Sequence, residues 1–275
     1  MQYGLDVATL GEGADPRRVV ELALAAEEAG WDGFFLWDSW AFVDGTPSGD
    51  PWVMLAAIAQ ATTQLRLETL IIPLARRRPQ VVANMLATLD LLSNGRMIFG
   101  AGLGGDPHEF AAFGEPADGK TRAAMLDEGL ELVARWLEGE RVTHHGAHYT
   151  VNDVAMVPRG VQQPRMPIWI GAERGKALQR AARWDGWGIY TVDVNGDTVR
   201  DAASVAQSLA TIRQHRAELG KDMQGYDVVV TGATQPGDSV EEYRAMGATW
   251  WLETLHLMRL PFNELMVRVV AGPPR

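Results

Sequence analysis

The sequence contains no cysteine and only three lysines in 275 residues. The absence of cysteine excludes disulfides, thiolate metal sites and a cysteine nucleophile. Positive charge is also scarce, because 25 lysines and arginines stand against 35 aspartates and glutamates, for a formal net charge of −10. Such a surface repels phosphate backbones and anionic lipid, which disfavours a nucleic-acid partner.

Long apolar runs are missing as well. None approaches the roughly 18 residues that a bilayer span needs, so we expect no membrane segment. Residues 1–6 enter a strand-like run at once, without the basic and apolar regions of a signal peptide. We therefore expect a cytoplasmic protein. Hydrophobic residues make up 47% of the chain, enough to build a sizeable core.

Short apolar runs rich in β-forming residues alternate with longer stretches of helical period. Two helices begin with an aspartate followed by proline, at residues 15–16 and 50–51. The predicted strands are residues 3–8, 33–37, 65–72, 96–101, 167–171, 186–192, 227–231 and 249–252. The predicted helices are residues 16–30, 51–63, 79–95, 108–113, 122–137, 175–184, 199–219, 239–246 and 262–270.

Eight strand–helix units with nearly continuous apolar strands are typical of a parallel sheet. In a chain of this length they favour a closed (β/α)₈ TIM barrel over an open sheet. Residues 140–167 interrupt the rhythm with several prolines and glycines, and we interpret them as an inserted hairpin and extended segment before the fifth strand. With no linker or repeat in the chain, we expect a single domain over residues 1–275.

The active site of such a barrel lies at the C-terminal ends of its strands. No lysine falls at a strand end, which disfavours a Schiff-base enzyme. No His-x-His follows the first strand, which disfavours a hydrolytic metal barrel. His144, His145 and His148 lie in the predicted hairpin, where we interpret them as polar surface residues and expect no metal site. The strand ends offer glycines and aromatics instead, which suit a flat apolar ring with an anionic tail.

Two glycine-rich turns are candidate cofactor contacts. Gly102 and Gly104 follow the fourth strand, where they would let backbone approach a ligand closely, or would simply form a tight turn. The turn Gly171-Ala172-Glu173-Arg174-Gly175 follows the fifth strand and leads directly into a helix. Its N–H groups and Arg174 could hold a phosphate. The alternative is an ordinary turn with a solvated arginine.

Asp38 follows the second strand between Trp37 and Trp40. A carboxylate among aromatic rings can have a raised pKa and transfer a proton. The alternative is that it caps a helix or forms an ion pair. The arginine run at residues 76–78 could meet an anionic ligand, or could be a solvated loop.

Taken together, these and other short motifs make the chain similar to the luciferase-like monooxygenase superfamily of flavin- or deazaflavin-dependent oxidoreductases. The match runs in order along nearly the whole chain. The matching stretches are residues 26–38 (AEEAGWDGFFLWD), 50–52 (DPW), 74–79 (LARRRP), 87–96 (ATLDLLSNGR), 109–114 (EFAAFG), 167–171 (PIWIG), 181–186 (AARWDG) and 247–253 (GATWWLE).

The resemblance implies that FMN or the deazaflavin coenzyme F-420 binds at the barrel mouth. The family places the flavin ring over a bulge after the third strand, often with a non-proline cis peptide, which here falls near Leu70, Ile71 and Ile72. The family places the cofactor phosphate near the two glycine turns, at Gly104 and at Glu173, Arg174 and Gly175. Gly102 and Gly171 are further expected cofactor contacts, as are Ile71 and Ile72 at the bulge. A homodimer and a small-molecule substrate are implied too.

One position departs from the family. Deazaflavin-using relatives often have Asp-His after the second strand, but this sequence has Asp38-Ser39. We expect reduced cofactor to pass hydride to a small organic substrate, or to react with oxygen to hydroxylate it, with Asp38 as the proton-transfer residue. Two alternatives are a non-catalytic relative that has lost flavin binding and a cofactor-free barrel enzyme such as an isomerase.

Overall fold

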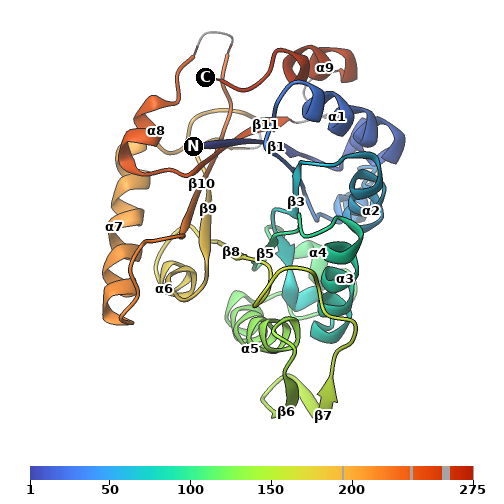
Figure 1. Ribbon diagram of the computed structural model, residues 1–275, viewed down its shortest axis with the longest axis vertical. Helices are drawn as coiled ribbons and strands as arrows, with labels where there is room; N and C mark the ends of the chain where they lie inside the picture. The colour runs from blue at the N-terminus through green and yellow to red at the C-terminus, as the bar shows by residue number, and fades with distance from the viewer. Residues whose placement is uncertain (194, 236–237, 256–260, 275) are drawn as a thin grey trace.

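The computed structural model describes residues 1–193, 195–235, 238–255 and 261–274. Parallel strands form a central barrel, and helices surround it (Figure 1). The barrel strands are β1 (Gln2–Val7), β2 (Gly33–Leu36), β3 (Arg66–Thr69), β4 (Ile72–Pro73), β5 (Phe99–Gly102), β8 (Ile168–Gly171), β9 (Gly186–Tyr190), β10 (Asp227–Gly232) and β11 (Trp250–Leu255). The predicted TIM barrel is therefore confirmed.

The strands follow the order β3-β2-β1-β11-β10-β9-β8-β5-β4. A parallel bridge between Leu67 and Met97 joins β3 to the segment before β5 and completes the ring. The strand that we predicted as continuous over residues 65–72 is broken, because Leu70 and Ile71 form a turn with a cis peptide bond between β3 and β4. The two pieces together take the place of one barrel strand, because β3 pairs with β2 and β4 pairs with β5.

The helices pack on the outside of this ring. The α-helices are α1 (Pro16–Glu28), α2 (Pro51–Ala61), α3 (Pro79–Leu92), α4 (His108–Ala111), α5 (Gly119–Leu137), α6 (Lys176–Arg183), α7 (Ala202–Glu218), α8 (Glu241–Met246) and α9 (Phe262–Val270). Short 3₁₀ helices are η1 (Gly11–Ala14), η2 (Ala41–Asp44) and η3 (Leu74–Arg76). No helix in the described part of the chain is both long and apolar enough to cross a bilayer.

Local capping explains where several helices begin. The Asp15 side chain accepts from the Arg17 N–H, and the Asp50 side chain accepts from the N–H groups of Trp52 and Val53. Both predicted starts are confirmed. Helix α5 begins three residues before the predicted start, because Asp118 accepts from the Thr121 N–H and so caps an earlier turn.

The predicted insertion before the fifth strand contains an antiparallel hairpin. Its strands β6 (Arg141–His145) and β7 (Thr150–Ala155) extend away from the barrel near α5 (Figure 1). Glu128 on α5 ties the hairpin down, since its carboxylate bonds to His144 Nε2 at 2.8 Å and accepts from the N–H groups of His148 and Tyr149.

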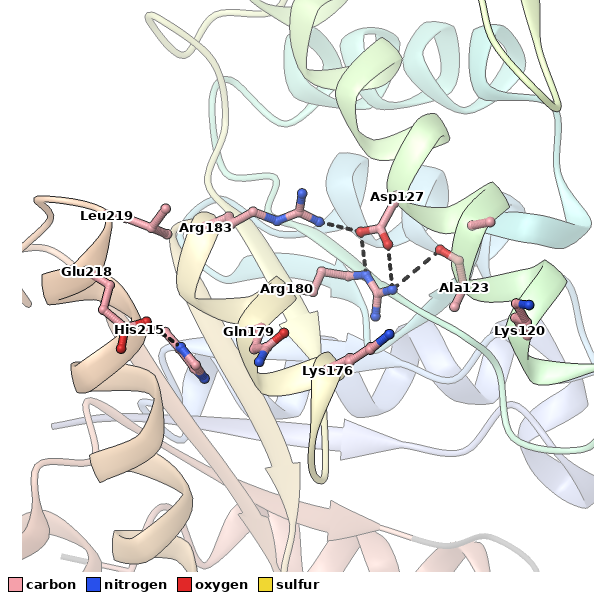
Figure 2. A pocket seen from close by; sticks show the side chains of 11 residues that line it. Lys120, Ala123, Asp127, Lys176, Gln179, Arg180, Arg183, His215, Glu218 and Leu219 are labelled. Atoms are coloured by element: carbon pink, nitrogen blue, oxygen red, sulfur yellow. Dashed lines mark hydrogen bonds and ion pairs between the residues drawn. The ribbon is translucent and has the colours of Figure 1, made fainter.

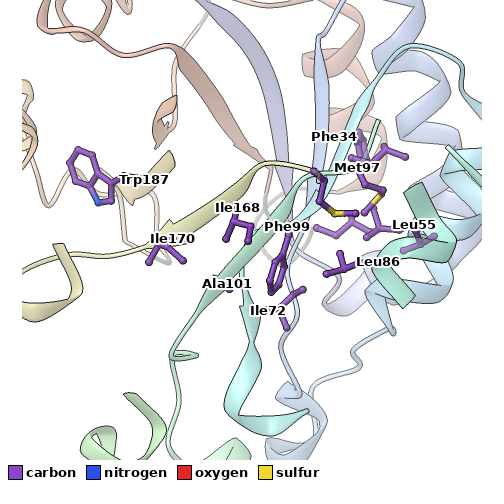
Figure 3. Close-up of a cluster of buried hydrophobic side chains, with 14 of the residues drawn as sticks. Phe34, Leu55, Ile72, Leu86, Met97, Phe99, Ala101, Ile168, Ile170 and Trp187 are labelled. Atoms are coloured by element: carbon purple, nitrogen blue, oxygen red, sulfur yellow. The ribbon is translucent and has the colours of Figure 1, made fainter. Parts of the chain in front are cut away.

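Alternate residues of each strand face two different cores. Phe34 and Leu36 join the outer core between strands and helices, and Figure 3 shows a part of it that includes Phe34, Leu55 and Met97. Phe35 points the other way, into the barrel, where a second cluster forms. Large rings fill that interior: Phe35 stacks on Trp169 at 5.9 Å between ring centroids and meets Trp250 edge-on at 5.6 Å.

Glycines on the same inner faces make room for these rings. A methyl group at Gly4 or Gly33 would overlap the ring of Phe35, and one at Gly186 would overlap Trp169. The barrel interior is therefore filled by large side chains that pack against the bare backbone of glycines.

Candidate functional site

The bulge between β3 and β4 lies at the barrel mouth, at the C-terminal ends of the strands. Its cis peptide joins Leu70 to Ile71, as the resemblance implied. The Ile71 side chain fills the space over two glycines, because a methyl group at Gly102 would overlap Ile71 Cδ1 and one at Gly171 would lie 2.9 Å from the same atom. The structure thus brings three predicted site residues together. Ile72 packs instead in the outer core.

An ion-pair cluster occupies the mouth beside the second strand. Asp38 is buried, and its carboxylate receives hydrogen bonds at 2.9 Å from the guanidinium groups of both Arg76 and Arg77. Arg76 also pairs with Glu109, which in turn accepts from the hydroxyl of Ser39. Ser39, at the position where the resemblance implies histidine, is therefore a member of a continuous network from Asp38 to Glu109.

Aromatic side chains cover this cluster. The Arg76 guanidinium lies 4.1 Å from the centre of the Trp40 ring. Trp40 in turn contacts Phe42 and Phe113, with ring centroids 5.9 and 5.4 Å away, and about half of each phenylalanine is exposed. The arrangement shields the ion pairs from water and presents an apolar wall to solvent.

Asp6, at the end of β1, is a buried carboxyl group that we did not single out from the sequence. It accepts hydrogen bonds from Trp37 Nε1 at 3.0 Å, from the Tyr190 hydroxyl at 3.1 Å and from the Thr254 hydroxyl at 3.0 Å. Burial raises the pKa of Asp6 to about 7, even though these three hydrogen bonds lower it. A carboxyl group with a pKa near neutrality can both give and take a proton.

Glu68 on β3 is a second acid inside the barrel. Neither of its carboxylate oxygens has a hydrogen-bond partner among the described residues. Burial raises its pKa well above the usual range, the nearby Arg66 lowers it, and Asp227 and Asp6 raise it further. Space for the carboxyl group comes from Gly100, where a methyl group would overlap Glu68 Oε1.

The predicted phosphate turn leads into α6. Gly175 has φ +59°, a backbone conformation that favours glycine, and Lys176 begins the helix. Glu173 forms an ion pair with Arg200 at 2.9 Å, so this carboxylate is neutralised. Arg174 is exposed. The turn therefore offers helix N–H groups and a cation to an anionic group.

In the turn after β5, the predicted glycine Gly104 and its neighbour Gly105 have different surroundings. Gly104 has φ +82° and packs closely on Pro73 and Phe110, so it shapes the turn. Nothing lies within 4 Å of the position that a side chain would occupy at Gly105. Bare backbone at the mouth, an apolar bulge and a cationic turn together fit a flat ring with an anionic tail.

A profile of the luciferase-like monooxygenase family matches residues 2–268. The chain belongs to that family. An uncharacterised protein of Mycobacterium tuberculosis is 30% identical over 220 residues, which cover 74% of this chain and 72% of the relative.

Solved structures of luciferase-like proteins share the fold. A monooxygenase from Streptomyces bottropensis superposes with a TM-score of 0.81 at 21% identity, over 98% of this chain and 96% of the other. The coenzyme F420-dependent tetrahydromethanopterin reductase from Methanopyrus kandleri gives 0.77 at 17% identity, over 98% and 97%. At these identities the likeness shows that the fold is shared.

In the hairpin, His144 takes part in a contact that holds the hairpin to α5. His144 bonds to Glu128, as described above, and no group of three histidine, aspartate or glutamate side chains within the described ranges is arranged to hold a metal ion.

Sequence reasoning missed three acidic residues of the site, Asp6, Glu68 and Glu109. Their one visible signal was an acidic residue within or next to an apolar segment.

Proposed function

We propose that this luciferase-like protein is an oxidoreductase that uses reduced FMN or coenzyme F-420 for hydride transfer to, or monooxygenation of, a small organic substrate. The observation that carries the proposal is the Ile71 bulge between Gly102 and Gly171 at the barrel mouth. The cofactor supplies the two-electron chemistry when bound. The chain supplies a binding surface, a dry environment and groups that hold protons.

Residues at the mouth divide these tasks. Ile71 supports one face of the ring, while Gly102 and Gly171 leave the room that the Ile71 side chain occupies. Gly104 shapes the turn after β5. Gly175 and Arg174 receive the phosphate at the start of α6. Homodimerisation, which the family resemblance implies, stays a prediction.

Asp38 remains our candidate for proton transfer. Its support is its place beside the mouth, in a network that joins two guanidinium groups, Glu109 and Ser39. Hydrogen bonds from Arg76 and Arg77 hold the Asp38 carboxylate in a fixed position beside the mouth. Asp6, whose pKa is about 7, is the alternative proton carrier.

The first experiment is a fluorescence titration of the purified protein with FMN and with coenzyme F-420. Saturable binding of one cofactor at micromolar concentration or tighter supports the proposal and identifies the coenzyme. No binding of either at high micromolar concentration would refute it and favour a cofactor-free relative.

The role of Asp38 is tested by Asp38→Ala, with Asp38→Asn as the companion of similar size. We expect turnover to fall by roughly 100-fold in both, the lower range for loss of a general acid or base, while cofactor binding changes little. Single-turnover kinetics and the cofactor titration measure the two quantities separately. Unchanged turnover would remove Asp38 from the mechanism and leave Asp6 as the candidate.

A further inference from the structure

A groove runs along the outside of the barrel between helices α5, α6 and α7, with a volume of about 830 Å³. Figure 2 shows side chains from all three helices around it. Four lysines and arginines line the groove against two carboxylates. The cations are Lys120, Lys176, Arg180 and Arg183. This positive surplus stands out in a chain whose net charge is −10.

The acids of the groove are already neutralised by neighbours. Asp127 binds Arg180 through two hydrogen bonds of 2.8 Å and also pairs with Arg183. Glu218 accepts from His215 on the same helix at 2.9 Å. The groove therefore has fixed internal ion pairs, which hold its walls in place but leave no carboxylate for the two lysines.

The ammonium groups of Lys120 and Lys176 form no hydrogen bond or ion pair with the described residues. They come from different helices, with Lys120 in the first turn of α5 and Lys176 at the first residue of α6, and both line the groove (Figure 2). Both are exposed, so they can bind a ligand without first breaking an internal contact. Two ammonium groups without partners, one on α5 and one on α6, suit an extended ligand that carries several negative charges.

The groove begins where the proposed phosphate turn ends. Lys176 follows Gly175 directly, and Arg174 is exposed one residue earlier. A ligand whose phosphate binds at this turn can therefore continue into the groove without a gap. FMN ends at its phosphate. Coenzyme F-420 continues beyond its phosphate into a chain of glutamates, so only the deazaflavin has a group for this groove.

We propose that the groove between α5, α6 and α7 binds the anionic glutamate tail of a deazaflavin coenzyme through Lys120 and Lys176. The inference rests on the proposed function and makes it specific, because it favours coenzyme F-420 over FMN. Solvent-exposed ammonium–carboxylate contacts are individually weak and are screened by salt. The effect on affinity is therefore moderate, and it grows with the number of glutamates.

The test is a fluorescence titration at low and at moderate salt with FMN and with F-420 carrying one or several glutamates. Wild-type protein is compared with the double variant Lys120→Gln/Lys176→Gln. Lys221→Gln is the matched control, because this third lysine donates to the Arg183 carbonyl and does not line the groove. We expect the longer tail to tighten wild-type binding on the order of 5-fold, and the double variant to lose that gain.

The outcomes separate the two proposals. Binding of F-420 with the same affinity for every tail length, or a double variant that behaves like Lys221→Gln, overturns the groove assignment and leaves the proposed function standing. Binding of FMN without binding of F-420 also overturns the groove assignment and leaves the proposed function standing. If neither cofactor binds, the proposed function fails and the groove assignment fails with it. A free oligoglutamate peptide that competes with long-tailed but not short-tailed F-420 supports the groove assignment.

Discussion

Asp6→Asn tests the most unusual titratable group of the mouth. The pKa of Asp6 is about 7 in the folded protein against 3.8 for an exposed aspartate. The folded state thus binds the proton more tightly than the unfolded state, so stability falls as pH rises from about 4 through 7. The full cost of ionising Asp6 is about 4 kcal/mol well above pH 7, and about 2–3 kcal/mol of it develops between pH 5 and pH 8.

The asparagine variant cannot ionise and lacks this pH-dependent loss. We therefore expect the stability of the variant, relative to wild type, to rise by about 2–3 kcal/mol between pH 5 and pH 8. For a chain of this size that corresponds to a relative gain in Tm of roughly 4–5 °C. Urea unfolding at several pH values measures the difference, and the comparison is independent of any constant offset from altered hydrogen bonds.

Two curves that run parallel with pH would refute the reasoning, since they would mean that Asp6 does not titrate in this range. A difference that changes in the opposite direction would mean that Asp6 is held as a carboxylate by the fold.

Two further predictions concern the same region. Trp37→Phe removes the indole donor that lowers the pKa of Asp6, so the pH midpoint of the Asp6 titration, followed by carboxyl ¹³C NMR, should move upward; a downward shift or none would contradict the assigned hydrogen bond. Gly102→Ala places a methyl group against Ile71 and should cost about 1–3 kcal/mol of stability and weaken cofactor binding. Gly105→Ala, where the added methyl meets open space, is the control, and equal effects in both variants would exclude steric contact with Ile71 as the cause.

The strand and helix pattern could be predicted because its signals are local. Asp15 and Asp50, each followed by proline, mark helix starts through contacts within three residues. The break at Leu70–Ile71 could not be read from the residues themselves, since the apolar run continues through it without interruption. It was expected only through the family resemblance.

The chemistry of the mouth depends on contacts between distant segments. Asp6 receives hydrogen bonds from residues 31, 184 and 248 positions away, and no sequence pattern links them. For Asp38, the sequence did not decide between a role in proton transfer and a role in an ion pair. The pair of arginines that binds it lies 38 and 39 residues further along the chain. Periodicity predicts which face of a strand is buried, but not which side chain from another strand it will meet.

The filling of the barrel by rings against glycines has a consequence for how this protein can change. Gly4 and Gly33 meet Phe35, and Gly186 meets Trp169, so each glycine is the space in which a neighbour's ring sits. Replacing any one of these glycines by a larger residue is sterically blocked. The same replacement conserves volume when the aromatic residue that contacts the glycine is also replaced by a smaller one. The interior should therefore vary in coupled positions, on one strand for Gly33 and Phe35 and on neighbouring strands for the other two contacts, with one member growing as the other shrinks.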